Sequence, residues 1–349
     1  MIDGLRGLAA LIVYLFHSTE FFGDSWRPAS GYLAVDLFFL LSGIVIAYSY
    51  DGRIGRSELG TVAFMRVRLV RFYPLLILAT LATAAVQLVA VRTGHLPITL
   101  VNGSLVLAVI LTLLFIPQRP TPNSTLYPLN APFWSLLDEL LINACFILAW
   151  RWLSNSLLAA VIVIGGIGLA FIVFHYGDLA GGPNWDTPHV GLVRVTFSFF
   201  VGVLMVRTIP RSTRRSDLVL VAASIILGLI LFFDPGRFRP AYDLVCVIVL
   251  FPLLAVLAIR FQAGPRGSRP ACWLGDASYG IYVFHAPFNG VILGLLGMLG
   301  FRQVGWLGFV WPMSAAMLIV FMLVLNRYFD VPLRRWLLRP SGRGDAPPF

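Results

Sequence analysis

The stretch DGLRGLAALIVYLFH, residues 3–17, is an apolar run that carries ionisable side chains. Arg6 and His17 are eleven residues apart. At about 100° per residue their side chains project from one face of a helix, separated by roughly 16 Å along its axis. Ionisable groups inside a membrane span avoid lipid and are functional candidates. The stretch therefore predicts a membrane helix with a basic entrance and a buried imidazole, the alternative being a core histidine bonded to nearby backbone.

Composition extends this reading to the whole chain. Its 349 residues are 58% hydrophobic and 12% charged, with a mean hydropathy of +0.85. Soluble domains carry about twice that charged fraction, and the long continuous apolar runs do not alternate as barrel strands do. The sequence predicts an all-α polytopic membrane protein. We expect residues 1–339 to form a single transmembrane domain and residues 340–349 a disordered cytoplasmic tail.

Charge, cysteine and histidine content exclude several classes of function. The net charge is +10, but the basic residues cluster in loops between apolar runs, which indicates contact with anionic lipid rather than nucleic acid. Cys145, Cys246 and Cys272 form no CxxC pair, and the five histidines lack metal-ligand spacing. Neither a disulfide framework nor a metal site is predicted.

The distribution of arginine predicts the topology. Eleven apolar segments are candidate spans: 5–22, 31–50, 70–92, 103–117, 133–151, 157–175, 190–207, 218–233, 242–261, 276–299 and 305–328. Four regions are basic: 51–71, 207–215, 260–269 and the tail after 326. These four regions lie on the same side of the membrane only if segment 103–117 does not cross it. We predict ten crossings, cytoplasmic termini, a re-entrant or interfacial segment 103–117, and an external loop 234–241.

Carboxylates in two spans form the candidate catalytic set with His17. Asp36 lies in the outer half of the second apolar segment. In the fifth, Ser135, Glu139 and Asn143 are spaced i, i+4, i+8 and share a polar stripe. This topology places His17, Asp36 and Glu139 at similar depth on three helices. We predict catalytic roles for these three and substrate contacts for Ser135 and Asn143.

The stretch RVRLVRFYP, residues 66–74, predicts an anion site at the cytoplasmic side. Arg68 and Arg71 share a helix face, and arginine offers bidentate recognition of phosphate. Arg66 and Tyr73 flank them. The alternative is an orientation signal, since arginines are routine at cytoplasmic helix ends.

A further polar stretch opens the tenth apolar segment, DASYGIYVFH at residues 276–285. Ser278 and His285 are seven residues apart and lie within about 20° on one face of a helix. We assign Ser278, Tyr279 and His285 to substrate binding. The alternative for His285 is a structural hydrogen-bond partner.

These motifs together resemble the acyltransferase-3 family of integral membrane O-acyltransferases. The resemblance rests on DGLRG with Arg-x10-His, GxxxVDxFFxxSG, RxxR before Tyr-Pro, WSLxxE, SYGIYxxH and Arg-Tyr-Phe-Asp-x-Pro, which run from residue 3 to residue 334. It implies about ten spans, cytoplasmic termini, and Arg6 and His17 in the active centre, with Arg68 and Arg71 serving the donor. Leu140 and the stretch Asp330-Val331-Pro332 depart from the family pattern.

The resemblance further implies transfer of an acyl group, commonly acetyl from acetyl-CoA, to a hydroxyl of a glycan, lipid-linked sugar or small natural product. We expect acyl-CoA as a donor substrate, no tightly bound cofactor, and a bacterial cytoplasmic membrane as the location. Arg6, Arg66, Arg68, Arg71 and Tyr73 would serve the donor. His17 would act as general base, oriented by Asp36 or Glu139. A covalent acyl-histidine variant stays open, as does a transporter or flippase of a lipid-linked glycan.

Overall fold

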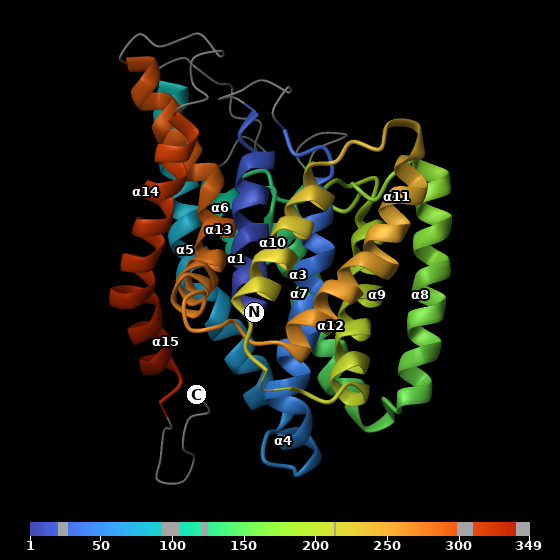
Figure 1. Cartoon of the computed structure of the whole chain (residues 1–349). Helices are drawn as coiled ribbons and strands as arrows, with labels where there is room; N and C mark the ends of the chain where they lie inside the picture. The colour runs from blue at the N-terminus through green and yellow to red at the C-terminus, as the bar shows by residue number, and fades with distance from the viewer. Residues whose placement is uncertain (20–26, 93–104, 120–124, 213, 299–309, 340–349) are drawn as a thin grey trace.

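A computed structural model describes residues 1–19, 27–92, 105–119, 125–212, 214–298 and 310–339. These residues form a helical bundle with no strand beyond two isolated bridges (Figure 1). The first half contains α1 (Ile2–Phe16), η2 (Gly31–Leu33), α3 (Ala34–Ile46), α4 (Gly52–Gly55), α5 (Thr61–Arg92), α6 (Leu105–Leu113) and α7 (Phe133–Ala149). The second half contains α8 (Asn155–Tyr176), α9 (Pro188–Thr208), α10 (Asp217–Phe232), α11 (Arg239–Val245), α12 (Phe251–Arg260), α13 (Ser268–Met298), α14 (Val310–Leu325) and α15 (Val331–Leu337).

The helix lengths fit a membrane. Eight helical segments in the described part of the chain are long and apolar enough to cross one. The helices α10 and α1 are shorter, with 16 and 15 residues, and they lie within the same bundle (Figure 1). The α1 helix packs against α13 and α3, and α10 packs against α1 and α12. The chain is thus an integral multi-pass membrane protein, and these eight segments with α1 and α10 correspond to the ten predicted crossings.

The helix α6 lies within segment 103–117, which we predicted to be re-entrant or interfacial. Its nine residues span roughly 14 Å at 1.5 Å per residue, which is about half of a ~30 Å hydrocarbon core. Its carbonyls are bound locally, because Gln118 Nε2 donates to Ala108 O and Tyr73 Oη donates to Leu113 O. The described helix packs against α5, and residues 103 and 104 of the segment lie outside the described residues, so its failure to cross the membrane stays a prediction.

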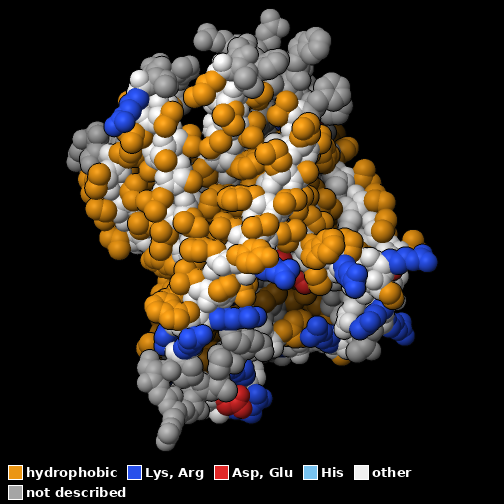
Figure 2. All heavy atoms as spheres, turned by 90° about the vertical axis from the view of Figure 1, so that its left-hand side faces the viewer, with side chains coloured by type: hydrophobic (Ala, Val, Ile, Leu, Met, Phe, Trp, Pro, Cys, Tyr) orange, Lys and Arg blue, Asp and Glu red, His pale blue; other side chains and the backbone are white. Residues whose placement is uncertain are grey.

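The four basic regions meet at one end of the bundle, which confirms that they share a side. Arg207 forms a bidentate ion pair with Asp51, and Arg66 Nη2 donates to Leu337 O. The amide of Gln262 donates to Arg214 O and so ties a third region to the second. Figure 2 shows arginine gathered along the lower part of one face, below a band of hydrophobic side chains.

The predicted external loop 234–241 lies at the opposite end. Arg239 pairs with Asp234 and donates to Ala29 O and to Tyr32 Oη, both near the start of α3. The charge of Arg239 is therefore engaged with neighbouring residues, whereas Arg237 is exposed and lies over the ring of Phe238.

The first helix ends earlier than its apolar run predicts. We expected a span over 5–22, but α1 stops at Phe16 and His17 is its C-cap. Two polar side chains occupy carbonyls of the last turn: His17 Nδ1 bonds to Val13 O, and Ser18 Oγ donates to Tyr14 O. Carbonyls satisfied in this way no longer need a continuing helix. Residues 20–22 of the predicted span, and the tail 340–349, lie outside the described residues.

Close helix crossings form the centre of the bundle. A Cβ on Gly43 of α3 would stand 2.1 Å from Phe199 O of α9, and a Cβ on Gly202 would stand 2.3 Å from Leu40 O. Such contacts are possible only because neither glycine has a side chain. Small residues at membrane helix interfaces allow backbones to approach closely. This crossing fixes α3 beside α9, and α3 supplies one wall of the site described next.

Candidate functional site

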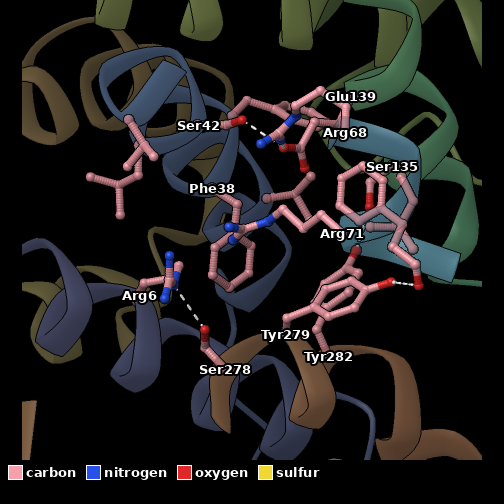
Figure 3. Close-up of a pocket in the computed structure, with 16 residues that line it drawn as sticks. Arg6, Phe38, Ser42, Arg68, Arg71, Ser135, Glu139, Ser278, Tyr279 and Tyr282 are labelled. Carbon is pink, nitrogen blue, oxygen red and sulfur yellow. Dashed lines mark hydrogen bonds and ion pairs between the residues drawn. The ribbon is translucent and has the colours of Figure 1, made fainter. Parts of the chain in front are cut away.

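A pocket opens between α1, α3, α5, α7 and α13 (Figure 3). It encloses about 720 Å³, counting the part that is open to solvent. Its charged lining comes from three helices: Arg6 on α1, Arg68 and Arg71 on α5, and Glu139 on α7. The lining residues are Arg6, Val35, Phe38, Phe39, Leu41, Ser42, Val45, Arg68, Arg71, Phe72, Ser135, Leu136, Glu139, Ser278, Tyr279 and Tyr282.

Arg6 is held in place by the start of α13. Its Nε donates to Ser278 Oγ at 2.8 Å and its Nη2 donates to Gly275 O at 2.8 Å. Asp3, one turn earlier on α1, lies 3.2 Å from the same guanidinium. These contacts lock α1 onto α13 and leave part of the Arg6 guanidinium facing the pocket. Ser278, predicted to bind substrate, lines the pocket as the partner of Arg6.

Arg68 and Glu139 form an ion pair in the pocket wall. Arg68 Nη2 lies 2.7 Å from Glu139 Oε1, which also accepts a hydrogen bond from Ser42 Oγ at 2.6 Å. Arg68 is only 3% exposed. The structure therefore places Glu139 with Arg68 and Ser42 rather than beside His17. This ion pair neutralises most of the positive charge of Arg68, which the sequence analysis had assigned to phosphate binding.

Arg71 differs from Arg68 although both follow the same helix face. It lines the pocket and is partly exposed. It makes no hydrogen bond or ion pair with any residue that the structure describes. Figure 3 shows its side chain reaching into the space between Arg6 and Arg68. An unpaired guanidinium in a pocket that also holds Arg6 is suited to bind an anion.

Tyrosine and serine side chains form another part of the pocket lining. Ser135 Oγ and Tyr282 Oη lie 2.6 Å apart, and Tyr279 Oη donates to Phe72 O. The ring of Phe38 meets Tyr282 edge-on, with centroids 5.5 Å apart. Ser135 and Tyr279, which the sequence assigned to substrate contacts, line the pocket. Phe38 and Tyr282 were not predicted.

His17 lies outside the pocket lining, at the end of α1 away from the basic loops. The sequence predicted an imidazole deep in a helix, but His17 is an exposed C-cap residue. Its ring is 5.0 Å from that of His285 on α13, which is 1% exposed. The ring of His285 is 6.3 Å from that of Tyr282. Tyr282 thus borders both the pocket and the histidine pair.

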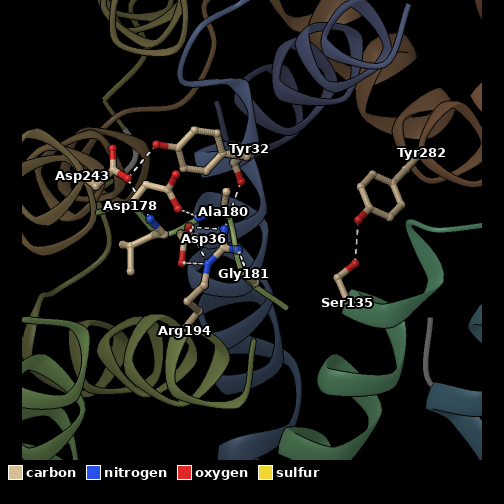
Figure 4. A network of polar contacts seen from close by, with 10 residues as sticks. Tyr32, Asp36, Ser135, Asp178, Ala180, Gly181, Arg194, Asp243 and Tyr282 are labelled. Atoms are coloured by element: carbon tan, nitrogen blue, oxygen red, sulfur yellow. Dashed lines mark hydrogen bonds and ion pairs between the residues drawn. The ribbon is translucent and has the colours of Figure 1, made fainter. Parts of the chain in front are cut away.

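Asp36 does not orient His17, because it belongs to a different network (Figure 4). Its carboxylate forms a bidentate ion pair with Arg194 of α9, and the two side chains are 0% and 1% exposed. Arg194 also donates to Gly181 O and Tyr32 O. Arg194 was missed, although an arginine inside an apolar run signals a buried partner.

Three other predicted residues lie away from the pocket lining. Arg66 is exposed and reaches α15, and Tyr73 bonds to Leu113 O. Asn143 is fully buried, and neither polar atom of its side chain has a partner among the described residues. The polar stripe of α7 therefore brings Ser135 and Glu139 into the pocket but not Asn143.

Comparison with known proteins assigns the chain to a family. A family model described as an acyltransferase domain matches residues 1–325. The chain belongs to the acyltransferase-3 family. This membership favours the predicted acyltransferase over the transporter alternative, and it makes the chain a membrane O-acyltransferase. No solved structure matches the chain.

Three relatives of this acyltransferase illustrate the match. "Protein 2 in picA locus" of Rhizobium radiobacter is 36% identical over 173 residues, covering 47% of this chain and 87% of the relative. Acyltransferase MdmB of Streptomyces mycarofaciens is 26% identical, and the match covers 99% of this chain and 94% of that protein. Peptidoglycan O-acetyltransferase OatA of Listeria monocytogenes is 26% identical, covering 82% of this chain and 48% of that protein.

Proposed function

We propose that this acyltransferase moves an acyl group, acetyl in particular, from acyl-CoA to a hydroxyl of a glycan, lipid-linked sugar or secreted natural product. The observation that carries the donor assignment is that Arg71 has no partner among the described residues and lines a pocket whose charged residues lie near the basic end of the bundle. A CoA thioester carries phosphates at one end and its acyl carbon at the other. The names of two relatives, a peptidoglycan O-acetyltransferase and an acyltransferase, support the class of acceptor and reaction.

The basic end of the bundle faces the cytoplasm in this proposal, because arginine-rich loops remain on that side of a bacterial cytoplasmic membrane. Arg71, with the free edge of Arg6, holds the phosphates of the donor. Arg68 shapes the wall through its ion pair with Glu139. The pantetheine arm then extends toward Ser135 and Tyr282, and the thioester passes the ring of Tyr282 to reach the histidine pair.

His17 acts as general base in the transfer step. Its Nδ1 bonds to the carbonyl of Val13 at 3.0 Å, and a carbonyl only accepts, so this nitrogen carries the proton and Nε2 is left with a lone pair. Nε2 takes the proton from the acceptor hydroxyl as the oxygen attacks the thioester carbon. The carbon–sulfur bond breaks, and the departing thiolate takes the proton from His17.

The donor assignment is tested with purified protein by comparing acetyl-CoA with acetyl-pantetheine, which lacks the nucleotide phosphates. Wild-type protein should prefer acetyl-CoA, and Arg71→Ala should raise the KM for acetyl-CoA about tenfold or more because a charged hydrogen bond contributes about 1.5–3 kcal/mol. The KM for acetyl-pantetheine should not change. Arg66→Ala, outside the pocket, is the matched control. Equal use of both donors by wild-type protein would reject acyl-CoA phosphate recognition.

The base assignment has a separate test. His17→Ala should lower kcat by about 10²–10⁴-fold, the usual contribution of general base catalysis, while the protein still inserts and purifies as a monodisperse species. Thiol release from acetyl-CoA in the presence of methyl β-D-glucoside is a suitable measurement. Wild-type turnover by the variant would exclude His17 as the base.

A further inference from the structure

The described residues place another imidazole, that of His285, beside His17, and neither Asp36 nor Glu139 reaches it. His17 ends α1 and His285 lies on α13, the helix against which α1 packs most extensively. The ring centroids are 5.0 Å apart and the planes are inclined by 30°. His285 is 1% exposed, so its surroundings within the bundle determine its hydrogen bonding. The carboxylates predicted to serve His17 are held by Arg194 and Arg68.

The hydrogen bonds of both rings define their tautomers. His285 Nδ1 lies 3.3 Å from Ile281 O, just as His17 Nδ1 lies 3.0 Å from Val13 O. Since each bond ends on a backbone carbonyl, each Nδ1 must donate a proton. Both Nε2 atoms therefore carry lone pairs and can only accept. In the neutral protein, two acceptors stand on adjacent rings with no proton between them.

Two acceptors next to His17 have no donor among the described residues. His285 Nε2 is buried and unpartnered, and so is Asn289 Oδ1 one turn further along α13. The amide nitrogen of Asn289 donates to Ser18 Oγ at 3.2 Å, which fixes the side chain beside the end of α1. A buried acceptor without a donor is unfavourable, and the cost is removed when a donor arrives.

We propose that His285 is the positioning residue of His17, and that its Nε2 accepts a hydrogen bond from His17 once His17 is protonated. This inference rests on His17 being the general base. The proton leaves the acceptor hydroxyl for Nε2 of His17, the new carbon–oxygen bond forms and the carbon–sulfur bond breaks. While His17 is an imidazolium, its Nε2–H is shared between the reacting oxygen and sulfur atoms on one side and His285 Nε2 on the other. The proton then moves to the thiolate, and His285 stays neutral throughout.

The position of the acceptor nitrogen can be tested with two amide substitutions. His285→Asn places its amide near Nδ1, which preserves the bond to Ile281 O and removes the acceptor at Nε2. His285→Gln places its amide near Nε2 and preserves that acceptor. His189→Gln, at an exposed histidine on α9, is the matched control. Thiol release is followed with acetyl-CoA and methyl β-D-glucoside, which counts transfer to the sugar and to water together.

His285→Asn should lower kcat roughly tenfold to a hundredfold, the range expected when a hydrogen bond to a charged group is lost, with both KM values unchanged. His285→Gln should recover most of this loss, and the control should match wild-type protein. A purely structural role predicts the reverse order, with Asn better tolerated than Gln. That order, or a loss confined to the KM for the acceptor, would overturn the inference.

A double-mutant cycle separates this inference from the proposed function. In a His17→Ala background, His285→Asn should cause no further loss, because the imidazolium it would stabilise is never formed. An equal loss in both backgrounds would reject the pairing while leaving His17 as the base. If His17→Ala alone retains wild-type turnover, the base assignment itself fails.

Discussion

At the scale of single residues, what an ionisable side chain can do depends on whether it is paired with a group of opposite charge. Arg68 and Arg71 have the same chemistry and share a helix face, yet one is paired with Glu139 and the other is unpaired among the described residues. A buried arginine that is paired with a carboxylate forms part of the pocket wall, whereas an arginine without such a partner can bind a ligand. Asp36 likewise belongs to Arg194 and stabilises the bundle.

The Asp36–Arg194 pair leads to a stability prediction. Asp36→Asn should destabilise the protein by about 3–5 kcal/mol, because removing one partner leaves a buried charge uncompensated. Thermal unfolding in detergent would show a lower Tm and a poor yield of monodisperse protein. The double variant Asp36→Leu with Arg194→Met should unfold at a higher temperature than Asp36→Asn. A stable but inactive Asp36→Asn protein would instead point to a chemical role.

At the scale of elements, helix ends and crossings determine where the side chains lie. The end of α1 places His17 beside His285 of α13, and the glycines of the α3–α9 crossing set the distance between these two helices. Since α3 also carries Ser42 and Phe38, the pocket wall depends on this crossing.

Because α3 and α9 cross so closely, we expect protein stability to depend strongly on the size of the side chain at position 202. Gly202→Val should cost about 1–3 kcal/mol or more, because overpacking forces backbones apart, and activity should fall as the pocket wall moves. Gly228 of α10, where an added Cβ meets nothing within 4 Å, provides the control. Gly228→Ala should leave stability equal or raise it by about 0.5–1 kcal/mol. Comparable tolerance at both positions, measured by unfolding in detergent, would contradict the close contact.

At the scale of the whole molecule, charge divides the bundle into two ends. The arginine-rich loops contact one another at the end where α1 begins and α15 ends. The histidine pair lies toward the opposite end, at the end of α1. A donor entering from the basic end and an acceptor entering from the other would meet within the bundle.

This arrangement predicts the sidedness of labelling. In a variant without its native cysteines, Ala180→Cys should react with a membrane-impermeant maleimide on intact cells, because it follows α8 at the end away from the basic loops. Gly60→Cys, at the basic end, should react only after the membrane is permeabilised. The reversed pattern would place the basic end outside and would exclude entry of a cytosolic donor there.

The sequence by itself determined the class, the positions of the helices and the shared side of the basic regions. Long apolar runs and clustered arginines are local features. Each segment enters the bilayer, and takes its orientation there, according to its own hydropathy and flanking charge. Helix-face spacing and the family resemblance indicated Arg6, Arg68, Arg71, Ser135, Ser278 and Tyr279 as site residues, and these line one pocket.

Only the tertiary structure decided which ionisable group pairs with which. Asp36, Glu139 and His17 share a predicted depth, but depth leaves the rotation of each helix open. The crossing of α3 with α9 turns Asp36 toward Arg194, and the packing of α1 on α13 sets His17 against His285. Pairing depends on contacts between helices far apart in the chain, and hydropathy and charge patterns within one helix do not specify those contacts.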